Sequence, residues 1–313
     1  MACDSLYCAW LKVHYPYELY ITMLKLYDEK KNTEKISAII AEMKRYKNIT
    51  MTAGKFGQDN RDWLVDKEHH TISQSLSSIR YIPKKAAQDL YRVGQMTKKV
   101  YETDEDDVIA ILEGREQRKI EKIVPAFDCF TDLLRELQMN TCLDTRQIKI
   151  LIELGYFEQF GGSAKLMKVY EEFFNGSMKL TKTVKSFVAR LEASRCLEES
   201  LSNESLSIQQ VLNSELSNIG LCLSVDAKAP SNLYFVKEID AKYGIKTVLY
   251  SIQRGTTGMI RFRKDEFEKK PLNVGDVIKL VKFNKSPRYT YKNGERAILP
   301  GAYDIWAKEY TII

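Results

Sequence analysis

Basic and aromatic side chains recur together in the last quarter of the chain, in segments that read as β-strands. Proteins hold single-stranded nucleic acids with this combination, a basic groove along the phosphates and aromatic rings that stack on bases for roughly 1–3 kcal/mol each. Arg261 and Arg263 are two positions apart, so a strand would place both on one face. The candidate binding residues of this region are Tyr250, Arg261, Arg263, Lys279, Lys282, Tyr289 and Tyr291. Each tyrosine alone fits a hydrophobic core or a cross-strand pair equally well, but the group together indicates nucleic acid.

An acidic run at residues 103–107, Thr-Asp-Glu-Asp-Asp, is another stretch whose residue types could do chemistry. A two-metal site for phosphoryl transfer would need carboxylates from separate strands around the ions. Here the acids are consecutive and precede an apolar segment at 108–112, as acids do in the first turn of a helix, which they stabilise by up to ~1 kcal/mol. We interpret the run as a helix start. No Asp-x-Asp pair in a strand-like context occurs, so we expect no catalytic residues, metal site or cofactor in this chain.

The positive charge of the protein is concentrated near its C-terminus. Residues 229–313 contain 16 Lys and Arg against 9 Asp and Glu, whereas residues 1–228 contain 32 against 33. A basic terminal region on a near-neutral body indicates an anionic partner for that region. Solubility alone is the alternative explanation.

The remaining composition is typical of a soluble, cytoplasmic protein. The 313 residues are 44% hydrophobic, enough for two or three domains with their own cores. No apolar run approaches the ~18 residues of a membrane span, so we expect no membrane contact. The six cysteines form no Cys-x-x-Cys motif and lie apart from the three histidines, which favours reduced thiols and argues against structural zinc.

The N-terminal two thirds of the chain have the apolar spacing of helices with one buried face. Apolar residues recur three and four positions apart over residues 5–27, with a break before Pro16, and again over residues 33–46. Residues 11–18 read Leu-Lys-Val-His-Tyr-Pro-Tyr-Glu. This row resembles the end of the fingers region of the bacterial DNA polymerase III α subunit, a C-family replicative polymerase, where Leu-Lys-x-His-Tyr-Pro-x-Glu is typical.

A short apolar turn at residues 76–83 leads directly into a predicted helix. Ile79 and Ile82 should point inward, and Pro83 suits a first helical turn. The segment resembles the hairpin of a helix-hairpin-helix module, whose two turn glycines bring the backbone against a phosphate. In this chain Tyr81 and Pro83 replace both glycines. The side chains that could still contact phosphate as point charges are Arg80, Lys84 and Lys85, with a solvated turn as the alternative.

Two later stretches resemble the same polymerase family, in the same order along the chain. Residues 151–161 read Leu-Ile-Glu-Leu-Gly-Tyr-Phe-Glu-Gln-Phe-Gly, close to the family pattern Leu-Ile-x-x-Gly-Ala-Phe-Asp-x-Phe-Gly. Glu215, Gly220 and Ser224 have the spacing of the family pattern Glu-x-x-x-Leu-Gly-x-x-x-Ser. The string 209–212, Gln-Gln-Val-Leu, is the nearest to a sliding-clamp peptide, but it lacks the aromatic ending and we interpret it as helix.

The last 85 residues change to the period of strands. The segments 233–239, 246–252, 257–263, 276–283 and 305–311 are rich in β-branched and aromatic residues, and 265–271 reads as a short helix. Asn293-Gly294 is a strong hairpin signal. We predict an α+β protein whose helical N-terminal two thirds, a fingers remnant and a helix-hairpin-helix region, are followed by a small OB-like β-barrel. The expected divisions are 1–60 for the fingers-like helices, 61–200 for the hairpin domain, 201–228 for a linker and 229–313 for the nucleic-acid-binding domain.

The resemblance implies the DNA-binding C-terminal portion of a replicative polymerase without its palm. Such a chain should not polymerise DNA alone. It would be either a truncated gene product or half of a split enzyme, with Mg²⁺ and the palm carboxylates supplied by another chain. The partners implied are template-primer or single-stranded DNA and a separate palm chain. Contact with the sliding clamp is left open. The alternatives are a non-enzymatic adaptor whose barrel binds RNA or a protein, and a nuclease or ligase accessory that shares hairpin and barrel.

Overall fold

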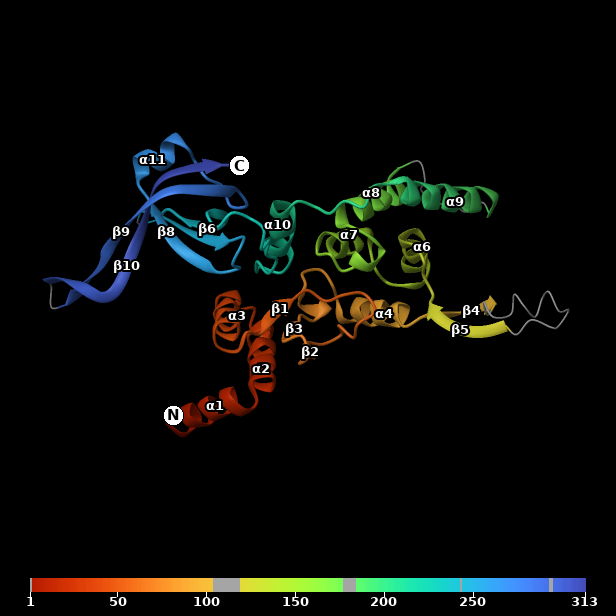
Figure 1. Cartoon of the computed structure of the whole chain (residues 1–313), viewed down its shortest axis with the longest axis horizontal. Helices are drawn as coiled ribbons and strands as arrows, with labels where there is room; N and C mark the ends of the chain where they lie inside the picture. Colours follow the sequence, from red (N-terminus) through yellow and green to blue (C-terminus); the bar gives the residue numbers. More distant parts are fainter. Residues whose placement is uncertain (1, 104–118, 177–183, 243, 293–294) are drawn as a thin grey trace. The chain divides into compact units, whose positions relative to one another are not determined.

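The computed structural model describes residues 2–103, 119–176, 184–242, 244–292 and 295–313 (Figure 1). Its architecture is α+β, a helical N-terminal region followed by a C-terminal mixed sheet, as predicted. The chain forms two compact units. The first unit comprises Met1–Thr52, Val65–Ser73 and Leu206–Ile313, and the second comprises Ala53–Leu64 and Gln74–Ser205. The predicted fingers-like helices and the predicted C-terminal domain therefore both belong to the first unit.

The first unit opens with the helices α1 (Ala2–His14), α2 (Pro16–Glu29) and α3 (Thr33–Lys47). The predicted break is confirmed, because Pro16 is the first residue of α2. The side chain of Asn32 caps α3 by accepting a hydrogen bond from the Lys35 backbone N–H at 3.0 Å. Helices α2 and α3 pack together through the buried side chains Tyr20, Leu24, Ile36, Ile39 and Met43.

Helix α1 has the predicted helical period but not the predicted burial. Its apolar side chains Leu6, Tyr7, Trp10 and Val13 are 47–75% exposed. The expectation of a buried face was therefore wrong for this helix. Periodicity shows that side chains share a face, but it does not show that a neighbour covers that face.

A small sheet follows α3 in the first unit. Strands β1 (Thr50–Thr52), β3 (Thr71–Ser73) and β2 (Leu64–Asp66) lie in that order, with β1 and β3 parallel. Met51 and Ile72 are paired in the register and both buried.

The second unit is mainly helical. Its helices are α4 (Lys84–Gly94), α6 (Phe130–Asn140), α7 (Thr145–Glu153), α8 (Ser163–Phe174) and α9 (Val184–Ser200), with 3₁₀ turns η1 (Leu76–Ser78) and η2 (Glu158–Phe160). Aromatic rings fill its core: those of Phe130 and Phe157 are 5.4 Å apart, and both side chains are fully buried. Ile79 and Ile82 are buried as predicted.

A two-stranded antiparallel ribbon, β4 (Thr97–Thr103) with β5 (Lys119–Pro125), also belongs to the second unit. Thr103 ends β4. The rest of the acidic run, 104–107, and the helix predicted after it lie outside the residues that the structure describes.

The C-terminal sheet is built from β6 (Leu233–Asp240), β7 (Ile245–Ser251), β8 (Thr257–Phe262), β9 (Val277–Lys292) and β10 (Glu295–Ile312), with α11 (Lys264–Lys269) between β8 and β9. The predicted strands and short helix are confirmed. The order β10-β8-β7-β6-β9, with β9 also paired to β10, brings the sheet almost to a closed ring. Closure rests on one parallel pairing, Trp306 of β10 beside Arg261 of β8.

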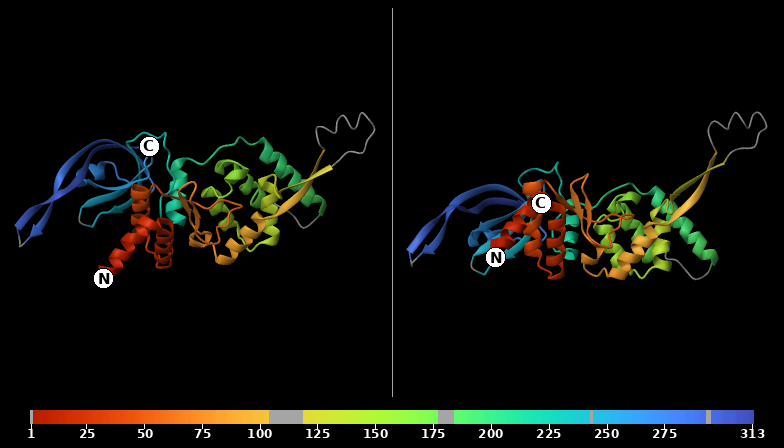
Figure 2. Two further views of the ribbon diagram at one scale, coloured as in Figure 1. Left: turned by 60° about the horizontal axis from the view of Figure 1, so that its bottom comes forward. Right: turned by 90° about the horizontal axis from the view of Figure 1, so that it is seen from below.

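The inside of this sheet is a hydrophobic core, and a helix covers part of the outside. Inward side chains include Val236, Leu249, Ile260, Ile278 and Leu280. Helix α10 (Ile208–Asn218) packs on the sheet through a separate cluster of Leu212, Phe235, Tyr250, Ile252 and Val277. The helical interpretation of 209–212 is thus confirmed. Beyond the ring, β9 and β10 continue together as a long hairpin (Figure 2), whose tip at Asn293 and Gly294 lies outside the described residues.

Candidate nucleic-acid interface

The parallel junction of β8 and β10 brings a cationic and aromatic group of side chains together. Arg261 Nε lies 3.3 Å from Asp304 Oδ1, and Arg288 Nε of β9 lies 3.0 Å from the same oxygen. The guanidinium of Arg261 is 5.7 Å from the ring centroid of Trp306. Trp306 Nε1 donates a hydrogen bond to Ser286 Oγ at 3.0 Å, which fixes the indole. We call Arg261, Arg288, Asp304 and Trp306 the Arg261 cluster.

This cluster carries net positive charge, because one carboxylate faces two guanidinium groups. The Asp304 side chain is only 15% exposed, whereas that of Arg288 is 45% exposed. Two guanidinium groups that share one carboxylate oxygen keep other N–H donors that this carboxylate does not use. Such donors bind phosphate oxygens with charge-assisted hydrogen bonds. The arrangement is chemically suited to an anion beside an aromatic ring.

Other predicted residues lie elsewhere on the same sheet. Arg263 is exposed at the residue before α11, and Tyr289 is 45% exposed where β9 continues into the hairpin. Tyr291 pairs through its backbone with Arg296, but its side chain lies outside what the structure describes. The structure thus places Arg261 on β8 and Tyr289 on β9, the two strands that pair with β10. The prediction for the Tyr291 side chain stays a prediction.

The two lysines of β9 are not beside Arg261. Lys279 is exposed and pairs in the register with Leu233 of β6 and Thr311 of β10. Lys282 forms an ion pair with Glu309 at 3.1 Å. Its charge is therefore locally balanced. Trp306, the register partner of Arg261, lies opposite Asn284, whereas Lys282 lies opposite Glu309 and Lys279 opposite Thr311. Both lysines are therefore further along β9 from the β8–β10 junction.

Tyr250 does not offer an exposed ring for stacking, which corrects its prediction as a platform. Its side chain is 3% exposed within the cluster under α10, and its hydroxyl donates to the Ser224 carbonyl at 3.0 Å. Burial raises the pKa of this phenol far above its usual value. Tyr250 is a core residue, the alternative stated for each tyrosine, because α10 covers this part of the sheet's outer face.

Beside Tyr250 is a cavity of about 420 Å³, lined by α3 and the sheet. Lys44 Nζ donates to the Arg254 carbonyl at 2.5 Å, and Lys237 Nζ donates to Ser37 Oγ at 3.4 Å. Cys222 also lines the cavity, and burial raises the pKa of its thiol to about 12. The Cys222 thiol is therefore protonated at neutral pH and is not activated as a nucleophile.

The hairpin of the second unit presents Arg80, Lys84 and Lys85 at its surface, where all three are exposed. Tyr81, which stands at a glycine position of the module, has φ +69 and a ring that is 55% exposed. Pro83 is the residue before α4 and has no N–H to donate. These cationic side chains and the Arg261 cluster belong to different units, so each group is a separate candidate.

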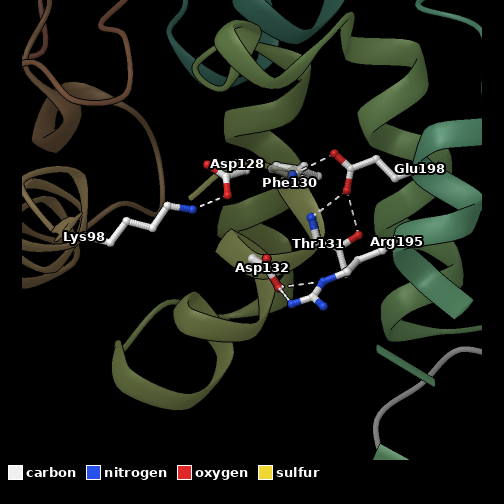
Figure 3. A network of polar contacts seen from close by, with 7 residues as sticks. All are labelled: Lys98, Asp128, Phe130, Thr131, Asp132, Arg195 and Glu198. Atoms are coloured by element: carbon white, nitrogen blue, oxygen red, sulfur yellow. Dashed lines mark hydrogen bonds and ion pairs between the residues drawn. The ribbon is translucent and has the colours of Figure 1, made fainter. Parts of the chain in front are cut away.

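A buried carboxylate joins two helices of the second unit, α9 and α6. Glu198 of α9 accepts hydrogen bonds from the backbone N–H of Phe130 at 2.7 Å and of Thr131 at 2.8 Å, and from the Thr131 hydroxyl at 2.7 Å (Figure 3). Arg195 forms an ion pair with Asp132 at 2.6 Å on the same pair of helices. The carboxylate thus caps α6 from a helix that is distant in sequence.

Sequence reasoning missed Trp306, Arg288 and Arg146. Trp306 was assigned only to a closing strand, although its alternation with Asp304 places both on one face. Arg146 lies 3.7 Å above the Tyr81 ring, a contact between segments that no local pattern reveals.

Within the part of the chain that the structure describes, no helix is both long and apolar enough to cross a membrane, and no three His, Cys, Asp or Glu side chains gather as a metal site would require. No model of a known protein family matches the chain, and none of the curated proteins does either. The resemblance to polymerases therefore rests on the quoted motifs.

Proposed function

We propose that this chain binds single-stranded or template-primer DNA, as the C-terminal portion of a replicative polymerase of the DNA polymerase III α type. The observation that carries the proposal is the C-terminal sheet together with the Arg261 cluster on its outer surface. On this proposal the chain adds no nucleotides by itself.

The connectivity of the sheet supports an OB-like barrel. In chain order the strands β6 to β10 are arranged first-second-third-fifth-fourth around the ring, with the third and fifth parallel and a short helix between the third and fourth. OB-folds are small Greek-key barrels that bind oligonucleotides across the second and third strands and the adjoining loops. Arg261 lies on the third strand, β8, and Arg288 lies on the fourth strand, β9, where it continues into the hairpin with the fifth.

The polymerase-like motifs have structural roles that fit their spacing. Gly155 and Gly161 have φ of +73 and +140, conformations that other residues rarely adopt. Glu215 accepts a hydrogen bond from the Ser224 hydroxyl at 2.6 Å, so the two ends of the third motif meet. These conformations and this contact give the motif residues structural roles, which supports the resemblance to the polymerase family.

The catalytic centre would lie in another chain on this proposal. A palm chain would bring the carboxylates that hold Mg²⁺, and this chain would bring affinity for DNA. Purified protein with Mg²⁺, nucleotides and a primed template should leave the primer unextended. Primer extension by the chain alone contradicts this part of the proposal.

Fluorescence anisotropy with a labelled oligo-dT tests the proposed interface. The double variant Arg261→Ala, Arg288→Ala should bind about tenfold or more weakly, since each guanidinium can supply a charge-assisted hydrogen bond worth about 1.5–3 kcal/mol. Lys35→Ala removes an exposed cation from the start of α3 and should leave binding unchanged. Equal affinity of the double variant and the wild type would remove the cluster from the interface.

The adaptor function is the alternative outcome of the same assay. RNA of matched sequence would then compete more strongly than DNA, or neither would bind. A protein partner would be indicated only in the second case.

A further inference from the structure

Tyr81 has a backbone conformation that a side chain normally disfavours. Its φ is +69, in the left-handed region where Cβ crowds the following carbonyl oxygen. Glycine would adopt this conformation without strain. Such strain in a bulky residue persists only where the surroundings hold it, and it is found most often at functional sites.

Helix α7 holds Tyr81 at two points. Gln147 Nε2 donates a hydrogen bond to the Tyr81 carbonyl at 2.8 Å. Gln147 is itself fixed by a capping box, because its backbone N–H donates to Asp144 Oδ1 at 2.7 Å while its side-chain oxygen accepts from the Asp144 N–H at 3.1 Å. Arg146, the residue before Gln147, places its guanidinium carbon 3.7 Å from the Tyr81 ring centroid.

The ring of Tyr81 does not serve the hydrophobic core. Its neighbours Ile79 and Ile82 are buried at 6% and 3% exposure, whereas Tyr81 is 55% exposed. The turn thus anchors itself through the two isoleucines and directs the tyrosine outward. A cation on one side of an exposed ring forms a flat, positively charged stack.

The charge around this stack is predominantly positive. Arg80, Lys84, Lys85, Arg146 and Lys149 are exposed on the hairpin and on α7. An aromatic ring among such cations matches the two elements of single-strand recognition, a stacking surface for the base and positive charge for the phosphates. Bases in a duplex are stacked on each other and present no free face, so the fitting ligand is an unpaired base.

We infer that Tyr81 and Arg146 form a platform on which an unpaired nucleobase of a single-stranded nucleic acid stacks, with Arg80, Lys84 and Lys85 near the adjoining phosphates. The inference rests on the proposed function for the class of ligand, but it concerns a different unit of the chain. On this inference, the side chain of Tyr81 contacts a base, where a helix-hairpin-helix glycine would bring the backbone against a phosphate.

Substitution of Tyr81 separates binding from folding. Tyr81→Gly removes the ring and relieves the positive φ, so the midpoint of thermal unfolding should stay equal or increase while affinity for labelled oligo-dT falls roughly 5- to 150-fold, the range for one lost base stack. Tyr81→Phe keeps the ring and should bind within about twofold of the wild type. The assay uses the full chain at one fixed salt concentration.

A photocrosslink gives a local readout. Oligo-dT carrying one 5-iododeoxyuridine should crosslink to Tyr81 in the wild type, as located by mass spectrometry, and not at that position in Tyr81→Gly. Tyr46 is a matched control, because it is 67% exposed with Arg45 5.3 Å from its ring centroid. Tyr46→Ala should change neither affinity nor crosslinking.

The results that overturn the inference differ from those that overturn the proposed function. Wild-type affinity of Tyr81→Gly for oligo-dT rejects the platform while leaving DNA binding intact. Wild-type protein that binds no oligonucleotide of any kind rejects both.

Discussion

At the scale of single residues, a buried carboxylate caps a helix that is distant from it in the sequence. Glu198 is 4% exposed and accepts three hydrogen bonds from the first two residues of α6. The local sequence around it, Glu198-Glu-Ser, is typical of an exposed surface. The partners are 67 and 68 positions away in sequence, and such a cap is visible only in the fold.

Replacement of Glu198 should destabilise the second unit. Glu198→Ala leaves buried donors without acceptors, at about 1–3 kcal/mol each, so we expect a loss of about 3 kcal/mol in the free energy of unfolding. Urea denaturation of the full chain measures it. Glu199→Ala, at an exposed neighbour in the same helix, should change stability little, and an equal effect of both variants would contradict the capping role.

Glu215 predicts a specific dependence of stability on pH. It is 3% exposed, and burial raises its pKa above the ordinary 4.5, although Leu223 and Ser224 donate hydrogen bonds to it. Between pH 4.5 and the raised pKa the folded state holds a proton that the unfolded state has released, so this group increases stability as the pH falls through that window. Urea titrations at several pH values should show the difference between wild type and Glu215→Gln changing in this window. A constant difference would contradict the raised pKa.

At the scale of elements, the sequence predicts starts, ends and periods better than it predicts neighbours. Pro16 marks a helix start as expected, and the period of the last 85 residues indicates the strands. Tyr250 shows the limit: its strand and its outward direction follow from the period, but α10 covers it. Neither the exposed face of α1 nor the contact of Arg146 with Tyr81 has a local signal.

The segment after α9 packs so closely against Gly162 that a side chain there would clash with it. A Cβ on Gly162 would lie 2.2 Å from the Glu204 carbonyl oxygen, while the Gly162 N–H donates to Asn203 Oδ1 at 2.6 Å. Gly162→Ala should therefore cost about 1–3 kcal/mol as the 203–205 segment is displaced from the start of α8. Thermal unfolding measures it. Gly258→Ala, where nothing lies within 4 Å of the added Cβ, is the control, and equal midpoints for the two variants would exclude the close packing.

At the scale of the whole molecule, the charge asymmetry of the sequence becomes a property of one domain-sized sheet. The excess of Lys and Arg over Asp and Glu lies in residues 229–313. These residues form the almost closed sheet of β6 to β10, whose outer surface carries the Arg261 cluster. We therefore expect contacts with phosphates to be the main source of affinity for single-stranded DNA.

The dependence of oligo-dT affinity on salt concentration tests this claim most directly. If three phosphates are contacted, the logarithm of the binding constant falls linearly with the logarithm of salt concentration, and affinity drops about 20-fold between about 50 and 200 mM. An affinity that stays the same over this range, or no binding at low salt, would contradict the account.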